Sequence, residues 1–123
     1  MSMAPRAVLA ALGCVLLNAP VLAGLADKLG RFTGYTIVAS KTISGYVDED
    51  GKKSDDFEGC DFDRKILFDD GTSATCASYS YTYAYRPTAV LLMKELSVRG
   101  LRMATVVMMV DDETYDMPPI RLR

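Results

Sequence analysis

A tight-turn signal, Asp70–Gly71, constrains the fold of this chain more than any other feature of its sequence. It lies between RKILF (64–68) and TCASYSYTYAY (75–85), two runs that contain many β-forming residues. Because Asp and Gly both tolerate positive φ angles, the pair predicts a β-hairpin with a two-residue turn. In such a hairpin the residue numbers of two paired positions sum to 141, so that Ile66 faces Thr75.

This register predicts which way a row of four tyrosines points. Tyrosine occupies every second position from Tyr79 to Tyr85, and the side chains of a strand alternate between its two faces. Because opposed residues of a hairpin share a face, the tyrosines lie on the same side as Ile66 and Phe68. That side is the apolar one, so the register predicts an inner wall of tyrosines.

A small core has little room for four tyrosines, because each buried hydroxyl needs a hydrogen-bond partner. We therefore expect Tyr79 and Tyr81 to lie deeper, and Tyr83 and Tyr85 to lie at a rim beside Arg86. The rim is the candidate contact surface, and its predicted binding residues are Tyr81, Tyr83, Tyr85 and Arg86. The alternative is that the row forms only a half-buried wall of the sheet.

A β-forming composition recurs along the rest of the chain. Six stretches carry it: 32–47, 64–68, 75–85, 88–95, 103–110 and 114–117. The stretch 88–95 also has the composition of a helix, but the turn signal Arg99–Gly100 before the next apolar run favours a strand. Gly34 and Gly45 indicate bulges or bends. The pattern predicts a mainly β fold, a small antiparallel barrel or rolled sheet of SH3-like or OB-like size.

Residues 1–26 have the composition of a helical signal peptide. A basic residue precedes the almost purely apolar run Ala7–Leu17, and small residues mark cleavage after Ala23 or Ala26. A membrane anchor is the alternative, which the shortness of the apolar run disfavours. We therefore expect 27–123 to form one small β-domain, periplasmic or secreted, with no membrane span after cleavage.

Two cysteines remain after such cleavage, Cys60 and Cys76, and an even pair in an exported chain predicts a disulfide. The hairpin register puts Cys60 opposite Tyr81, five residues from Cys76, which is too far for a bridge. We therefore expect residues 58–63 to leave the ladder and fold back as a loop joined to the polar face of the sheet. A reduced pair is the alternative.

The composition argues against several classes of function. Removing Arg6 from 14 basic residues leaves 13 against 16 acidic ones, and the basic residues are scattered, which argues against nucleic-acid binding. The chain has no His, so no imidazole serves as a catalytic base or a metal ligand. Gln and Trp are also absent, which disfavours a lectin. We expect no cofactor and no metal site, because the acidic run 48–50 and its neighbours do not have the spacing of a calcium loop.

Asp61 and Asp63 share a face by alternation, which suits a hydrolase that uses paired carboxylates. Such chemistry also needs a cleft in which one carboxyl group stays protonated, and a domain of this size offers little with which to build one. We therefore expect no catalytic residues.

The runs FEGCDFDRKILFDDGT (57–72) and TCASYSYTYAYRPTAVLL (75–92) resemble small uncharacterised exported proteins of bacteria. The resemblance covers about Gly34 to Met117, and it implies export and a strand at 88–95 but no activity. We expect a non-catalytic binding or interaction module of the cell envelope, whose partner is an envelope protein or a small ligand. The alternatives are a purely structural envelope protein and a small carboxylate hydrolase.

Overall fold

The computed structural model describes residues 24–123, so the predicted signal peptide lies outside the described residues up to position 23. The chain divides into two units, Met1–Thr33 and Gly34–Arg123. In the first unit, residues 24–30 are helical and a turn follows them. Over the described range, no helix is long and apolar enough to span a bilayer.

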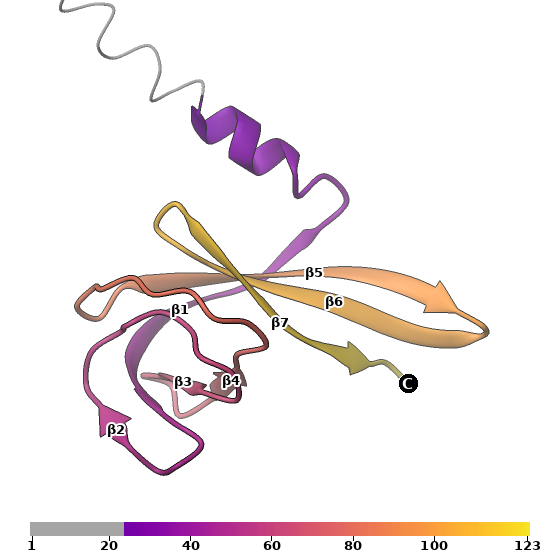
Figure 1. The fold of residues 1–123 in the computed structure, drawn as a ribbon. Helices are drawn as coiled ribbons and strands as arrows, with labels where there is room; N and C mark the ends of the chain where they lie inside the picture. Colours follow the sequence, from indigo (N-terminus) through magenta and orange to yellow (C-terminus); the bar gives the residue numbers. More distant parts are fainter. Residues whose placement is uncertain (1–23) are drawn as a thin grey trace, which may run out of the picture. The chain divides into compact units, whose positions relative to one another are not determined.

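The second unit is one antiparallel β-sheet (Figure 1). Its strands are β1 (Thr36–Val47), β2 (Lys53–Ser54), β3 (Lys65–Phe68), β4 (Ser73–Thr75), β5 (Thr88–Val98), β6 (Leu101–Val110) and β7 (Glu113–Arg121). Hydrogen bonding orders them β4-β3-β1-β5-β6-β7, and β2 pairs with β1 off this path. The prediction of a mainly β, antiparallel fold is confirmed.

The sheet is not closed, so the expected barrel does not form. Its two ends are β4 and β7, and no strand pairing joins them. A backbone hydrogen bond from the Ala77 N–H to the Asp116 carbonyl (3.2 Å) links β7 to the chain just after β4.

β1 serves two parts of the sheet because it bends. Its first half pairs with β5, its second half pairs with β3, and register shifts lie near both ends. The second shift is at Gly45, as the sequence predicted, and a Cβ atom there would lie 2.1 Å from the carbonyl oxygen of Ser54. Only glycine fits this bulge. Gly34 instead lies in the turn before β1, with a φ of 89°.

The C-terminal third of the chain is a meander of three long strands. The ambiguous stretch 88–95 is confirmed as a strand, and β5 continues beyond it to Val98. Arg99 and Gly100 have φ values of 52° and 81°, as a two-residue hairpin turn of type I′ requires. β7 is longer than expected and contains Pro118–Pro119, which it tolerates because it is an edge strand.

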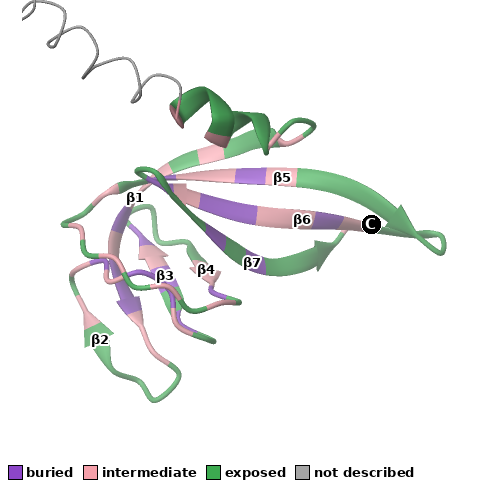
Figure 2. Ribbon diagram, turned by 45° about the horizontal axis from the view of Figure 1, so that its top comes forward, coloured by how far each residue is buried: buried purple, intermediate pink, exposed green. Residues whose placement is uncertain are grey.

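The core gathers where the two halves of the sheet face each other, and Figure 2 shows the buried positions on β1, β5, β6 and β7. Tyr46 of β1, Ile66 of β3 and Met108 of β6 are almost fully buried. The ring of Phe57 meets that of Tyr115 edge-on, with the centroids 5.6 Å apart. Phe57 thus fixes the loop between β2 and β3 against β7.

Candidate binding surface

The hairpin at Asp70–Gly71 forms in a different register from the one expected. Ile66 pairs with Ala74, so paired positions sum to 140 instead of 141. The turn has three residues instead of two, since the Phe68 N–H donates to the Thr72 carbonyl (2.9 Å) and Gly71 takes a φ of 86°. A shift of one residue moves every side chain of the second strand to the opposite face.

The prediction of inner tyrosines is therefore wrong. The residues between the tyrosines are the partly buried ones: Ser80, Thr82 and Ala84. The tyrosines themselves are all more than half exposed: Tyr79 66%, Tyr81 64%, Tyr83 59% and Tyr85 66%. The expected gradient from a deep pair to a rim pair does not exist, because all four rings point outward.

Residues 79–86, which we call the tyrosine strap, belong to no regular strand, so the predicted strand 75–85 ends at Thr75. The strap lies within the long connection between β4 and β5 (Figure 1). Isolated bridges attach it to the preceding loop at Ala84, which pairs with Phe57, and at Ser80, which pairs with Cys60. Each bridge has two backbone hydrogen bonds, with lengths of 2.9 to 3.1 Å.

A disulfide joins Cys60 to Cys76 at the start of this connection, with their Cα atoms 5.6 Å apart. Both residues are buried in the core, so the expected attachment to the polar face of the sheet is wrong. The separation of Cys60 and Cys76 expected from the sequence was too long. The chain turns at residues 61–63, where Asp63 has a φ of 63°, and this turn brings the two cysteines together. The turn interrupts the ladder, which resumes at Cys60 and Ser80 in the same register.

The strap lies directly against the backbone of Gly59. A Cβ atom at this position would lie 2.0 Å from the carbonyl oxygen of Ser80 and 2.8 Å from the nitrogen of Thr82. Gly59 also has a φ of 83°, which side chains disfavour. The close approach of the two segments therefore requires glycine.

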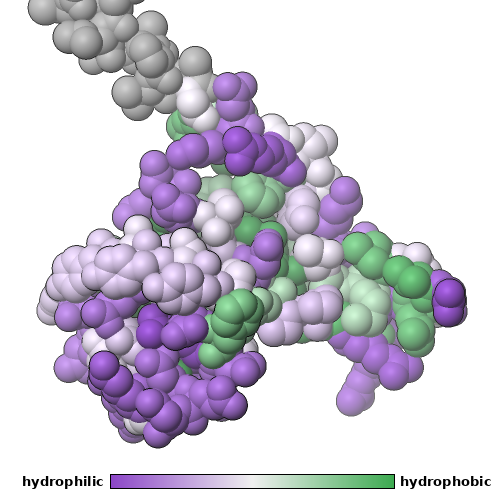
Figure 3. Space-filling view, viewed as in Figure 1, coloured by the Kyte–Doolittle hydropathy of each residue, from purple (hydrophilic) through white to green (hydrophobic). Residues whose placement is uncertain are grey.

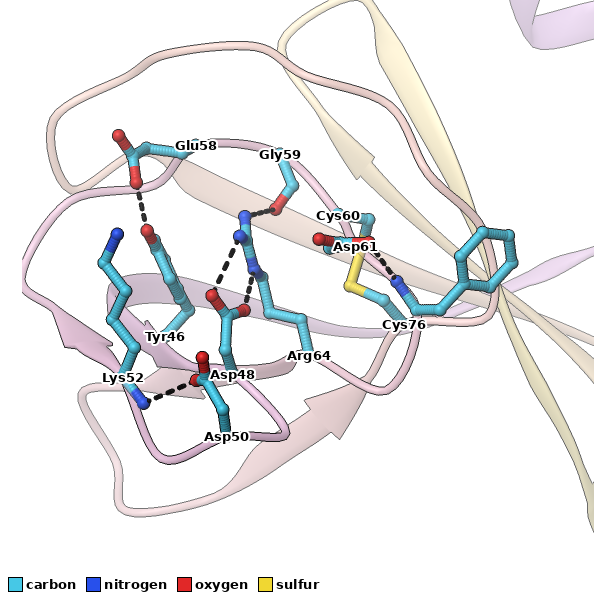
Figure 4. Close-up of polar contacts among 11 residues, drawn as sticks. Tyr46, Asp48, Asp50, Lys52, Glu58, Gly59, Cys60, Asp61, Arg64 and Cys76 are labelled. Atoms are coloured by element: carbon cyan, nitrogen blue, oxygen red, sulfur yellow. Dashed lines mark hydrogen bonds and ion pairs between the residues drawn. A yellow bond between two sulfur atoms is a disulfide. The ribbon is translucent and has the colours of Figure 1, made fainter.

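A polar network holds the loop that carries Gly59 (Figure 4). The buried Arg64 donates from Nε to Asp48 (2.5 Å) and from Nη1 to the Gly59 carbonyl (3.3 Å), and its guanidinium lies 3.9 Å from the centroid of the Tyr46 ring. The Tyr46 hydroxyl donates to Glu58, and this bond together with burial raises the pKa of Tyr46. The loop under the strap is thus fixed by charge-assisted bonds in a poorly hydrated place.

Carboxylates lie beside one end of the strap. The negative charge of Asp56 raises the pKa of Tyr83, with smaller contributions from burial, a hydrogen bond to Asp56 and the charge of Glu58. Arg86 lies at this same end of the strap, since Phe57 pairs with Ala84. It is exposed and has a φ of 42°, where the chain turns toward β5. The residues predicted to bind, Tyr81, Tyr83, Tyr85 and Arg86, are all exposed in the strap.

The expected carboxylate pair takes a different form. Asp61 and Asp63 lie at a turn, so strand alternation does not place them on one face, and Asp63 is exposed. Asp61 contributes to an open hollow of about 470 Å³ that Asp48 and Phe62 also line. Within residues 24–123, no group of three or more acidic or cysteine side chains is arranged to hold a metal ion.

An apolar groove of about 370 Å³ lies elsewhere, between the edge strands β4 and β7. Val38, Leu91, Val106 and Met117 contribute to its walls. No sequence pattern indicated this groove, because its walls come from five strands that only the fold brings together.

Searches of protein-family models, curated proteins and solved structures find nothing similar to this chain. The resemblance to exported bacterial proteins stays a prediction.

Proposed function

We propose that this protein is a non-catalytic binding module of the cell envelope and that the tyrosine strap is its contact surface. The observation that carries the proposal is the orientation of the strap. Four tyrosine rings are 59 to 66% exposed on one side, while the alternate residues face the protein. Rings exposed to solvent contribute little to the free energy of folding, so we attribute the row of rings to binding.

Tyrosine suits this role because it offers a large apolar ring and a polar hydroxyl with few rotatable bonds. In extended chain, rings at every second residue are about 6.6 Å apart, and four of them cover roughly 20 Å. A row of this length and spacing matches an extended ligand better than a compact one. The support from Gly59, the disulfide and the Arg64 network holds the row in place before binding, which reduces the entropy lost on association.

The chemistry around the row favours an extended segment of a partner protein that carries basic residues. Asp56 and Glu58 act electrostatically on Tyr83, so a lysine or arginine of the ligand would meet both a carboxylate and an aromatic face. The absence of Gln, and of Asn outside the first 26 residues, removes the amides that commonly bind sugar hydroxyls.

The test compares two variants of matched exposure. Tyr81→Ala/Tyr83→Ala removes two strap rings, whereas Phe62→Ala removes a ring that is 63% exposed outside the strap. Each protein is immobilised and exposed to envelope extract, and proteins retained by the parent are then synthesised as overlapping peptides. Peptide affinity is measured by the tyrosine emission, which is visible because the chain has no Trp.

We expect the double variant to lose an extended basic peptide that the Phe62→Ala variant still binds, with both variants unfolding at the parent's urea concentration. Equal binding by the double variant and the parent would refute the proposal. A double variant that unfolds much more easily would instead show that the rings support the fold.

A further inference from the structure

The free end of the β5–β6 hairpin carries exposed aliphatic side chains. Leu96 is 38% exposed, Val98 50% and Leu101 46%. Leu96 opposes Met103 and Val98 opposes Leu101, and opposed residues share one face of the sheet. We call these four side chains the aliphatic tip. Figure 3 shows hydrophobic side chains gathered at this end of the molecule with hydrophilic ones beside them.

Four exposed arginines lie at the same end of the sheet: Arg99, Arg102, Arg121 and Arg123. Strand pairing brings the two pairs together, because Met103 is the partner of Arg121 and the Leu122 N–H donates to the Arg102 carbonyl (2.8 Å). The sequence hides this group, since about twenty residues separate the first pair from the second.

The charge at this end is strongly positive. One acidic residue lies within 95–104 and 117–123, Glu95, and it pairs with Arg102 at 2.7 Å, which lowers the pKa of Glu95. Four arginines and one glutamate leave a net charge of +3. By contrast, residues 48–70 contain ten acidic and four basic residues, a net charge of −6. The sheet is therefore charged oppositely in its two parts.

We infer that this end is a peripheral contact for an anionic phospholipid surface. The aliphatic tip enters the boundary between headgroups and acyl chains, and the arginines bind lipid phosphates with paired N–H groups. Basic residues next to a small apolar insertion give this kind of attachment, because neither contribution is sufficient alone. The contact is independent of the tyrosine strap.

The shape of the tip favours a lipid surface over a protein partner. A stable protein interface needs roughly 800 Å² on each side, which four side chains at the end of a two-stranded ribbon do not supply. A bilayer has no such requirement, since it closes around a narrow protrusion and its charge is spread over many headgroups. The acidic part of a second copy would attract the arginines too, so the experiment must separate these two occupants.

A reporter on the tip reads insertion directly. The reporter is the full chain with Cys14→Ser, so that the remaining native cysteines are the disulfide-bonded pair. The Val98→Cys substitution then adds one free thiol, which is labelled with an environment-sensitive fluorophore. Lys53→Cys, labelled in the same way, serves as the control because Lys53 is exposed in the acidic part of the sheet. Vesicles of phosphatidylcholine with and without phosphatidylglycerol are then added.

We expect a blue shift of the tip label with the anionic vesicles only, and no shift of the control label. The double substitution Arg99→Gln/Arg121→Gln removes two positive charges. It lowers the affinity of the unlabelled chain for anionic vesicles by about 25-fold, about fivefold for each arginine. Lys52→Gln/Lys53→Gln removes the same charge elsewhere and leaves binding unchanged. Both double variants keep residues 1–33 unchanged, so that segment contributes equally to vesicle binding in the two.

Three results would overturn the inference. One is a tip label that does not respond to anionic vesicles, and another is an equal response to phosphatidylcholine alone. The third is a label that shifts with protein concentration when no lipid is present, since this would identify the tip as an interface between copies of the chain.

Discussion

Replacing Gly59 by alanine tests whether the close approach of the strap to the loop determines the shape of the binding surface. The new Cβ would lie 2.0 Å from the Ser80 carbonyl oxygen, which is far inside van der Waals contact, and the atoms it meets belong to backbone. The strap must therefore move away. That movement strains the bonds between Ser80 and Cys60, which are 2.9 and 3.0 Å long.

The loss in free energy of unfolding expected for Gly59→Ala has two contributions, and a control variant separates them. Alanine at a φ of 83° costs about 1–2 kcal/mol through backbone strain alone. Overpacking adds about 1–3 kcal/mol. Gly51 has a similar φ of 91° and nothing within 4 Å of its Cβ position, so Gly51→Ala incurs only the first part.

We expect Gly59→Ala to lower the free energy of unfolding by roughly 2–5 kcal/mol and Gly51→Ala by roughly 1–2 kcal/mol. Urea denaturation of both variants, followed by far-ultraviolet circular dichroism, measures the difference. Equal losses in the two variants would refute the argument, because they would mean that the strap does not lie against Gly59.

The remaining predictions concern the strap's attachment and its electrostatics. Replacing Cys60 and Cys76 together by alanine lowers the free energy of unfolding by about 3 kcal/mol, from the 16-residue separation, and makes urea unfolding insensitive to reductant; a parent that reductant does not destabilise has no bridge. Tyr115→Phe raises stability by about 1 kcal/mol, because it removes a buried hydroxyl that lacks a hydrogen-bond partner among the described residues; lower stability in the same urea assay would contradict this. Asp56→Asn lowers the pKa of Tyr83 toward its ordinary value, since the removed negative charge opposes ionisation of the phenol; an NMR titration that finds the Tyr83 pKa unchanged would contradict this.

The local patterns of the sequence predicted the strands well where pairing is between neighbours in the chain. The hairpin at Arg99–Gly100 and the apolar run 103–110 follow from turn chemistry and from hydrophobicity on both faces. The bulge at Gly45 was predicted from a glycine inside a strand pattern, and the structure adds the reason, which is that the backbone of Ser54 comes close there. These features depend on short-range physics that the sequence contains.

The orientation of the tyrosines depended on one residue in one turn. Asp70–Gly71 fits a two-residue turn and a three-residue turn with Asp69 equally well, since both place Gly71 at a positive φ. The choice between them inverts every side chain that follows. Hydrogen bonds from the Thr72 N–H and hydroxyl to the Asp70 carboxylate, and the ion pair between Asp70 and Lys41, stabilise the longer turn, and Lys41 is distant in sequence.

The small residues of the strap contain a signal that sequence alone did not resolve. Ser80, Thr82 and Ala84 alternate with the tyrosines, and they are the residues that face the loop around Gly59. The inner side of the strap lies on the core, against which Ala84 packs. A close-packed core leaves room there only for small side chains, so tyrosine rings at these positions would force the strap away from it. The small residues therefore occupy the inner side, and the tyrosines that alternate with them point to solvent.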